Sequence, residues 1–286
     1  MVTITHGDRV VYPDDGWTKA EVVAHYGRVA DAMLPHLANR PLTLVRHRSN
    51  ITEKGFFQKN SPDYFPAFIH RIAVPKAGGV NQHASVDSAE GLQYLANQGA
   101  LELHVALATA PELYKPDRLV IDLDPLSDDP AQVRVAARRV RALLDELQLA
   151  SVPVASGGKG YHVYLALVPN ADSHDIARAA LILANALAHR FPDELTIETL
   201  KKNRNGRVYV DWLRNVPSAT VIAPYSLRAR AHAPVAVPIE WDELDDVAPN
   251  GITIATVGAR LDRADSLVAL AREPIDAAGM CARLDA

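Results

Sequence analysis

Two aspartates separated by one residue are the sharpest chemical feature of this chain. The stretch RLVIDLDP, residues 118–125, is rich in β-branched and apolar side chains, which is typical of a buried strand. Because alternate side chains leave the same face of a strand, we expect Asp122 and Asp124 on one face, about 7 Å apart at their Cα atoms. Two carboxylates there repel unless water or a cation stabilises them, and oxygen ligands on one strand suit Mg²⁺ or Mn²⁺. The stretch is also typical of a strand that ends in a turn, since Asp and Pro both favour turns.

A glycine-rich loop lies between two apolar segments further along. The segment SGGKG, residues 156–160, separates VPVA from YHVYLAL, and His162 starts the second apolar run. Its glycines let backbone N–H groups approach an anion closely, while Ser156 and Lys159 add a hydroxyl and a charge. The spacing is not that of a Walker A loop, and such a hairpin is also common as a plain turn. Next to a carboxylate-bound metal, the loop would suit a triphosphate.

A third acid follows a basic turn. In KKNRNGRVYVDWLRN, cations that include Arg204 surround an Asn-Gly turn, and the next strand places Asp211 on the same face as Tyr209. With Asp122 and Asp124, this aspartate would complete a set of metal ligands.

Two adjacent phenylalanines, Phe56 and Phe57, lie between Lys54 and Lys59 in KGFFQK. Neighbouring side chains of a strand face opposite sides, so at most one of the pair is core and the other is displayed. A displayed aromatic with flanking lysines is what base stacking beside a phosphate track needs. The alternative is one phenylalanine in the core and the other against a loop.

The elements around these residues can be read from local signals. We expect residues 1–17 to form a short strand and turn, and a helix to follow because Thr18 and Glu21 match a capping box. Arg9 and Lys19 flank the turn, so the chain reversal brings two cations together. Charges at a turn are usually only solvated.

Two further strands carry polar side chains. PLTLVRHRSN runs into a basic edge at Arg46, and LELHVAL places His104 opposite an apolar face, where histidine is more often structural than catalytic. Helices are expected from Asp129-Pro130 onward and over residues 173–190, both with regular apolar faces.

Composition excludes several classes of protein. The chain has 286 residues, 48% of them hydrophobic, which is ample for a core. A single cysteine, Cys281, excludes an internal disulfide framework and fits a reducing cytoplasm. No apolar run reaches about 18 residues, and no secretory segment is visible. The formal net charge of −4 argues against coating a duplex by bulk charge, although it permits a local basic groove.

The motifs DLD, SGGKGYH, VDWLRN and PYSLRAR, in this order, resemble the polymerase domain of bacterial DNA ligase D, a branch of the archaeo-eukaryotic primase superfamily. The similarity runs from GDRVVYP to WDEL. It implies an α+β primase fold, with a central mixed or antiparallel sheet like an RNA-recognition motif and flanking helices. We expect one domain, residues 1–286, in three parts: an N-terminal lobe with end-binding and base-stacking elements (about 1–115), a catalytic core (about 116–235) and a closing segment (about 236–286).

The resemblance also implies roles for the polar residues. Asp122, Asp124 and Asp211 would be catalytic and hold two Mn²⁺ or Mg²⁺ ions, which activate the primer 3′-hydroxyl and neutralise the leaving pyrophosphate. Five side chains would bind the nucleoside triphosphate: Ser156, Lys159, His162, Arg228 and Arg214.

Other matches concern the base and the DNA. Phe56 or Phe57 would stack on a base, and Arg9 and Lys19 would recognise a 5′-phosphate across a gap. Three more side chains match the pocket or the template path: Arg46, His104 and Arg204.

The function implied is a nucleotidyltransferase that adds ribo- or deoxyribonucleotides, with ribonucleotides preferred, to primer 3′ ends at gaps and double-strand breaks in non-homologous end joining. Expected partners are gapped or broken DNA with a 5′-phosphate, nucleoside triphosphates, Ku and a separate DNA ligase, because the chain shows no ligase or nuclease motifs. We expect a monomer in the bacterial cytoplasm, associated with the nucleoid and not with a membrane. The alternatives are a non-catalytic module that binds 5′-phosphorylated DNA ends and a two-metal phosphohydrolase or nuclease.

Overall fold

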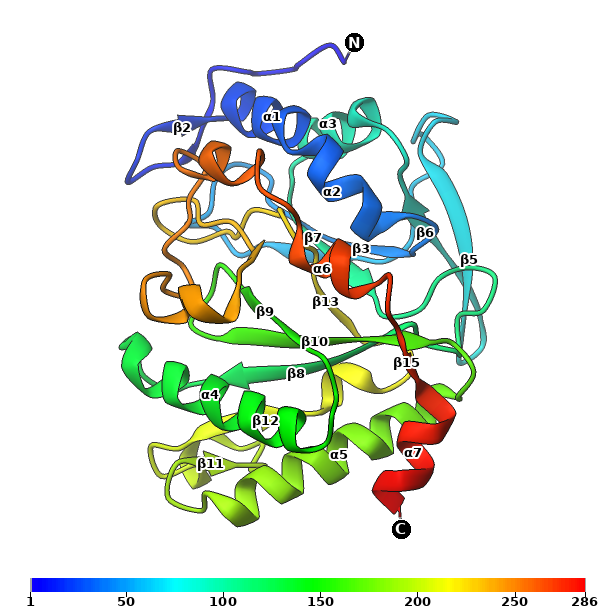
Figure 1. Ribbon diagram of the computed structural model, residues 1–286. Helices are drawn as coiled ribbons and strands as arrows, with labels where there is room; N and C mark the ends of the chain where they lie inside the picture. Colours follow the sequence, from blue (N-terminus) through cyan, green and yellow to red (C-terminus); the bar gives the residue numbers. More distant parts are fainter. Residues whose placement is uncertain (1, 286) are drawn as a thin grey trace.

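Two β-sheets, each covered by helices, form the framework of the computed structural model, which describes residues 2–285 (Figure 1). The first sheet has the order β13-β7-β3-β6-β5, with β4 paired to β3. Its strands are β3 (Leu42–Arg46), β4 (Phe56–Gln58), β5 (His70–Lys76), β6 (Gly79–Ser85), β7 (Ala100–Ala106) and β13 (Thr220–Ile222). Helices α1 (Lys19–Arg28), α2 (Ala30–Leu37) and α3 (Ala89–Asn97) lie over this sheet (Figure 1).

Helix α1 begins with the predicted capping box. The Glu21 carboxylate accepts a hydrogen bond from the Thr18 backbone N–H at 2.8 Å, and the Thr18 hydroxyl accepts one from the Glu21 N–H. A hairpin of β1 (Val10–Tyr12) and β2 (Trp17–Thr18) precedes the helix. The apolar side chains of Val22, Tyr26, Met33 and Leu37 are buried. Helix α1 ends at Arg28 and α2 begins after Val29, so two helices replace the single one expected.

The second sheet has the order β11-β12-β8-β10-β9-β14, with β15 paired in parallel to β10. Its strands are β8 (Arg118–Asp124), β9 (Val152–Ala155), β10 (Tyr161–Val168), β11 (Leu195–Thr196), β12 (Val208–Asp211), β14 (Val237–Pro238) and β15 (Ile275–Asp276). Helices α4 (Pro130–Glu146) and α5 (Ser173–Arg190) cover its outer face (Figure 1). Asp129 caps α4, because its carboxylate accepts a hydrogen bond from the Ala131 N–H at 2.9 Å.

Short elements complete the chain. They are the 3₁₀ turns η1 (Lys201–Asn203), η2 (Leu213–Asn215), η3 (Trp241–Asp245) and η4 (Val257–Arg260), and the helices α6 (Ser266–Leu270) and α7 (Ala277–Asp285). Among the helices of residues 2–285, none is long and apolar enough to cross a membrane.

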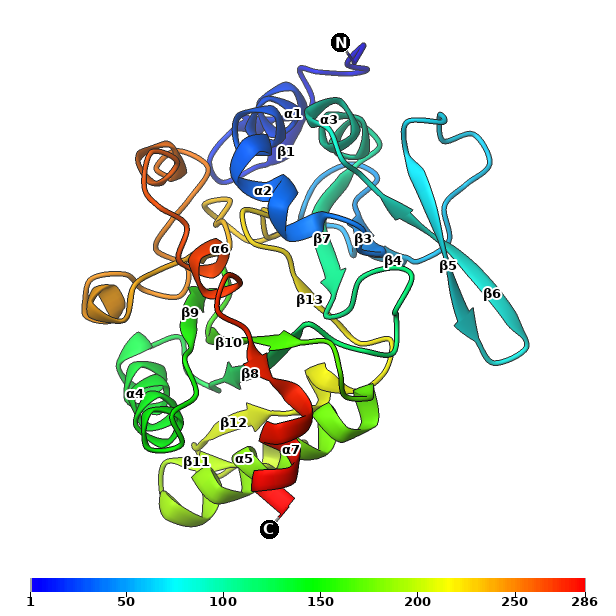
Figure 2. The same ribbon diagram turned by 45° about the vertical axis from the view of Figure 1, so that its right-hand side comes forward.

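The chain crosses between the two sheets more than once. Strand β13 lies within the range expected for the catalytic core, yet it pairs with β7 of the first sheet. Strands β14 and β15 come from the closing segment and join the second sheet. The α+β fold is confirmed, but neither sheet consists of one continuous stretch of sequence. The β5–β6 hairpin projects from the body beside them (Figure 2).

Strand β8 lies near the middle of the second sheet, antiparallel to both neighbours. Asp122 is the register partner of His162 on β10 and of Asp211 on β12. Three polar side chains from separate parts of the chain therefore meet in one row across the sheet.

Candidate active site

The predicted carboxylates gather on β8 and β12. Asp122 and Asp124 share a face of β8, as their spacing predicts, and Asp211 lies directly across from Asp122. Asp211 is buried, whereas Asp122 and Asp124 are partly exposed. The Asp211 carboxylate accepts hydrogen bonds from the Tyr209 hydroxyl at 3.1 Å and from the Leu213 N–H at 2.9 Å.

A single arginine bridges two of these acids. The Arg214 Nε lies 3.1 Å from Asp122 Oδ2 and 3.0 Å from Asp211 Oδ2, and His162 Nε2 lies 3.4 Å from Asp122 Oδ1. Burial opposes ionisation of Asp122, but His162 and Arg214 outweigh it and hold its pKa at about 2. Burial and the neighbouring Asp122 charge raise the pKa of Asp211. The two carboxylates thus depend on cationic neighbours to share the site.

Asp124 has its own cationic partner. Arg204 Nη1 donates to Asp124 Oδ2 at 2.9 Å, and this arginine is buried. The backbone carbonyls of Glu198 and Thr199 accept from the same guanidinium, which fixes its position. The structure thus places Arg204, which the resemblance assigned to the pocket or template path, as a buried counter-charge to Asp124.

The donor set fits a hard divalent ion in its chemistry, because it offers carboxylate oxygens from one face of two adjacent strands. Within residues 2–285, no group of three or more His, Cys, Asp or Glu side chains is arranged to hold an ion. Arg214 and Arg204 contact these carboxylates. An ion that used the same oxygens would compete with the two guanidinium groups.

The glycine-rich loop lies beside these acids as the β9–β10 turn. Gly157 has a φ of +67°, which favours glycine, and a Cβ atom on Gly160 would collide with the Leu123 carbonyl oxygen of β8. The Ser156 hydroxyl donates to the Gly160 carbonyl at 2.5 Å. The glycines therefore allow the loop to lie against the end of the strand that carries Asp124.

One pocket is lined by two of the three predicted metal ligands and by all five predicted triphosphate residues. It is lined by two acids, the loop and a ring of cations: Asp122, Asp124, Ser156, Gly158, Lys159, His162, Lys201, Arg214, Arg228 and Arg230. Lys159 is partly exposed, with its Nζ 3.0 Å from Asp128 Oδ1. The excess of cations makes the pocket suitable for a polyanion that arrives with a metal ion.

Glu102, on β7, is a site residue that the sequence analysis missed. Its carboxylate lies 2.9 Å from His104 Nε2 and 3.2 Å from Arg228 Nε, and it accepts from the Ala229 N–H at 3.0 Å. Burial opposes ionisation, but His104 and Arg228 hold the Glu102 pKa at about 2. Arg228 in turn donates to the Ser156 carbonyl at 3.0 Å. The Glu-x-His spacing, which puts Glu102 and His104 on one strand face, was the available signal.

The two phenylalanines are both displayed. Phe56 is 40% exposed and Phe57 is 69% exposed, so the alternative with one of them in the core is wrong. Phe57 meets His104 edge-on, with ring centroids 6.0 Å apart, and lines a hollow that shares Arg228 with the carboxylate pocket. Phe56 instead lies beneath the Arg46 guanidinium, 5.7 Å from it.

Arg46 and the N-terminal cations are held by backbone carbonyls. Arg46 Nε donates to the Gln98 carbonyl at 2.8 Å. Lys19 is only 4% exposed, and its Nζ donates to the Thr5 carbonyl at 2.7 Å. Burial and the nearby Arg9 charge lower the Lys19 pKa. Arg9 and Lys19 are therefore close together, as predicted, and they are not simply solvated.

Comparison with known proteins identifies relatives. A family model described as LigD, primase-polymerase domain, matches residues 18–268. The multifunctional non-homologous end joining DNA repair protein LigD of Mycobacterium tuberculosis is 39% identical over 280 residues, which cover 93% of this chain and 36% of that protein. The bifunctional non-homologous end joining protein LigD of Bacillus subtilis is 34% identical over 259 residues, which cover 90% of this chain and 42% of that protein. The chain thus spans well under half the length of these relatives.

The solved structures include a close match in fold. The polymerase domain from Mycobacterium tuberculosis ligase D, in complex with DNA, superposes with a TM-score of 0.86 and 37% sequence identity. The match covers 96% of this chain and 99% of that one.

Proposed function

The chain belongs to the LigD primase-polymerase domain family, and on that premise we propose that it is a metal-dependent nucleotidyltransferase that extends DNA 3′ ends at gaps and breaks. One observation carries the proposal: Asp122 and Asp124 line a pocket with a glycine-rich loop and several cations, and Asp211 lies directly across from Asp122 on the adjacent strand. Acids that attract metal ions and cations that attract phosphates are both needed for nucleotidyl transfer.

The roles follow from position. Two Mn²⁺ or Mg²⁺ ions held by Asp122, Asp124 and Asp211 would supply Lewis-acid activation of the 3′-hydroxyl and charge neutralisation. Lys159 in the loop and Arg228 beside it would hold the triphosphate in place before the reaction. Ser156, whose hydroxyl is tied to Gly160, would act chiefly by shaping the loop.

Nucleotide and DNA binding would use the neighbouring surfaces. Phe57, exposed beside Arg228, would stack on a base while the triphosphate extends toward Lys159. The proposed 5′-phosphate site lies at Arg9 and Lys19. Arg9 Nε is buried without a hydrogen-bond partner among the described residues, which supports binding of an anion such as a 5′-phosphate there. A preference for ribonucleotides, the partners Ku and a separate ligase, a monomeric state and a location at the bacterial nucleoid belong to the same proposal.

A non-catalytic module that binds 5′-phosphorylated DNA ends is a second candidate. The observation in its favour is that Arg214 and Arg204 between them already contact all three carboxylates, so each acid has a cationic partner without an ion. A polymerase requires that these arginines give way to metal ions.

The deciding experiment extends a labelled primer on short gapped DNA, with and without a 5′-phosphate, using ribonucleotides or deoxyribonucleotides and Mn²⁺. We expect addition that the 5′-phosphate stimulates, that favours ribonucleotides, that releases pyrophosphate and that the Asp122→Ala variant lacks. Tight 5′-phosphate-dependent binding without any addition would instead support the end-binding module.

A further inference from the structure

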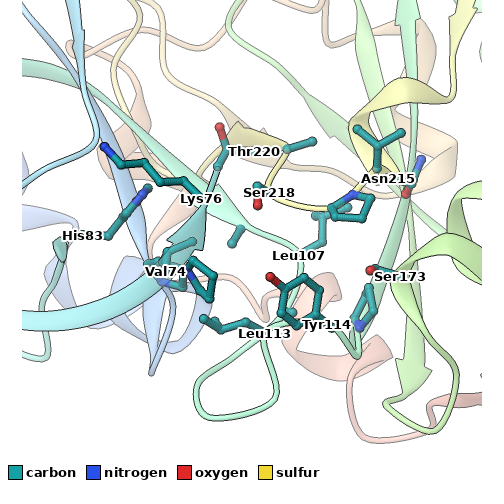
Figure 3. A pocket seen from close by; sticks show the side chains of 18 of the residues that line it. Val74, Lys76, His83, Leu107, Leu113, Tyr114, Ser173, Asn215, Ser218 and Thr220 are labelled. Carbon is teal, nitrogen blue, oxygen red and sulfur yellow. The ribbon is translucent and has the colours of Figure 1, made fainter. Parts of the chain in front are cut away.

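A mostly apolar pocket, here named the Tyr114 pocket, shares one lining residue with the carboxylate pocket. Figure 3 shows the side chains that line it. It is bounded by the β5–β6 hairpin, the segment 106–116 and the segment 214–220 that follows β12. Val74, Leu107 and Leu113 contribute to its apolar wall, and the ring of Tyr114 lies against it (Figure 3). Its walls thus come from three distant parts of the sequence.

The charged residues that line the pocket are all positive. Its lining includes Lys59, Lys76 and Arg214, and within the described chain it contains no Asp or Glu. An apolar wall beside three cations and no acid fits a ligand that has a flat apolar part and a negative charge, as a nucleotide does.

The two pockets adjoin through Arg214, which lines both. The glycine-rich loop lies at the Asp124 end of β8, where Gly160 contacts Leu123. The segment after β12 runs toward the opposite end of β8, since the Asn215 amide hydrogen-bonds the Val120 backbone at 2.7 and 2.8 Å. Asp122 therefore lies between the loop and the approach to the Tyr114 pocket.

This order has a chemical consequence. In phosphoryl transfer the attacking and leaving oxygens are roughly in line with the phosphorus between them. If the pyrophosphate leaves on the loop side of Asp122, the attacking 3′-hydroxyl arrives from the Arg214 side. The strand that carries this hydroxyl then passes the Tyr114 pocket.

We propose that the Tyr114 pocket binds a nucleotide of the strand being extended, just upstream of its 3′ end. This inference rests on the proposed polymerase function and adds the location of the primer strand. The base or sugar lies against Tyr114 and Val74, and the flanking phosphates meet Lys59 and Lys76, both of which are exposed. Arg214 then links strand occupancy to the acids, because it is the one side chain shared by both pockets within residues 2–285.

A charge swap at Ser218 tests the inference. Ser218 is exposed, lines the pocket and has a φ of +65°, a conformation that Asp and Asn both tolerate (Figure 3). Ser218→Asp and Ser218→Asn are nearly identical in shape and differ in charge. We expect single-stranded DNA to bind the Asp variant about 5- to 10-fold more weakly than the Asn variant at low salt, measured by fluorescence anisotropy without metal or nucleotide.

The lysines predict a second signature. Replacing both Lys59 and Lys76 with Gln should flatten the slope of log K against log salt by about 1.4, since each phosphate contact on a single strand contributes about 0.7. Arg272→Gln, on an exposed arginine outside the pocket, is the control and should keep the slope. An unchanged slope in the double variant, or equal binding by the two Ser218 variants, overturns the proposal.

The position of the nucleotide is tested with 2-aminopurine near the primer 3′ end. Its fluorescence should change on binding, and Tyr114→Leu should remove that change. A Tyr114-dependent signal only from the template strand, or displacement of the primer signal by free nucleoside triphosphate, would assign the pocket to another ligand and overturn the proposal.

Primer extension by the unmodified protein separates the two levels of inference. If the protein extends primers but the two Ser218 variants bind single-stranded DNA equally, the proposed role of the pocket is rejected and the proposed function is kept. A Tyr114-dependent primer signal without extension rejects the function and keeps the pocket as a strand-binding site.

Discussion

Asp122 and Asp211 face each other directly across the β8–β12 pair, and one atom, the Nε of Arg214, lies within 3.1 Å of both carboxylates. The chain therefore supplies an internal cation where a divalent ion would bind. An ion that used the same oxygens would compete with this guanidinium, so we expect the stability and the metal affinity of the site to be coupled.

Arg214→Gln tests that coupling. Without metal, the variant should unfold at lower temperature, by an amount that corresponds to about 1 kcal/mol, because two neighbouring carboxylates lose a partly exposed counter-charge. Mn²⁺ should bind the variant more tightly than it binds the unmodified protein, and this binding should restore the lost thermal stability. Calorimetric titration and thermal unfolding with and without Mn²⁺ measure both effects. Weaker Mn²⁺ binding by the variant would show that Arg214 does not compete with the ion.

Glu102→Gln should affect nucleotide binding more than turnover. The amide keeps the shape but removes the charge that positions Arg228 and His104. We expect the KM for nucleoside triphosphate to rise about tenfold, while kcat falls less, because losing a charged hydrogen bond costs about 1.5–3 kcal/mol. Glu112→Gln, on an exposed acid, is the matched control. A fall in kcat at constant KM would contradict a positioning role.

Glu243 predicts acid sensitivity of the closing segment. Hydrogen bonds from Arg260 hold its pKa at about 2, and the Arg260 nitrogens lie 2.5 and 2.9 Å from its carboxylate. Since the folded-state pKa is below the ordinary value of 4.5, the stabilisation is full above that value and is lost as the pH falls toward 2. In urea unfolding at pH 7, 4 and 3, the unmodified protein should lose about 2 kcal/mol more between pH 7 and pH 3 than Glu243→Gln does. If the free energy of unfolding falls equally in the variant, the acid sensitivity comes from other groups than Glu243.

Phe57 and Phe56 provide a paired test of base stacking. Phe57→Ala should weaken nucleotide or template binding by about 1–3 kcal/mol with little change in thermal stability, because the ring is 69% exposed and lies beside His104. Phe56→Ala should have the smaller effect on binding, since its ring lies under Arg46 and Arg48. Nucleotide titrations of both variants would reveal the reverse order if Phe56 were the stacking residue.

Lys19→Met should reduce discrimination for a 5′-phosphate. Methionine keeps most of the buried packing and removes the charge next to Arg9. The ratio of affinities for gapped DNA with and without the phosphate should fall several-fold, as measured by anisotropy. Lys202→Met, at an exposed position in η1, should leave the ratio unchanged. An unaltered ratio in Lys19→Met would remove this lysine from the phosphate site.

Local periodicity allowed much of the site to be predicted from the sequence. The two-residue repeat of a strand puts Asp122 and Asp124 on one face whatever surrounds them. The Thr18 capping box and the Asp129 cap are likewise local hydrogen bonds, and both are present. The ordered motifs predicted the family and the α+β fold, which the comparisons confirm.

Register and long-range partners were decided only by the tertiary structure. That Asp211 faces Asp122, 89 residues earlier in the sequence, depends on how β8 and β12 align, and no local pattern sets that alignment. The same holds for Arg204 beneath Asp124 and for Glu102, whose role depends on a partner 126 residues away. Sequence spacing determined which side chains share a strand face. Packing of the two sheets decided which charges neutralise which, because desolvation favours pairing between whatever charges the fold brings together.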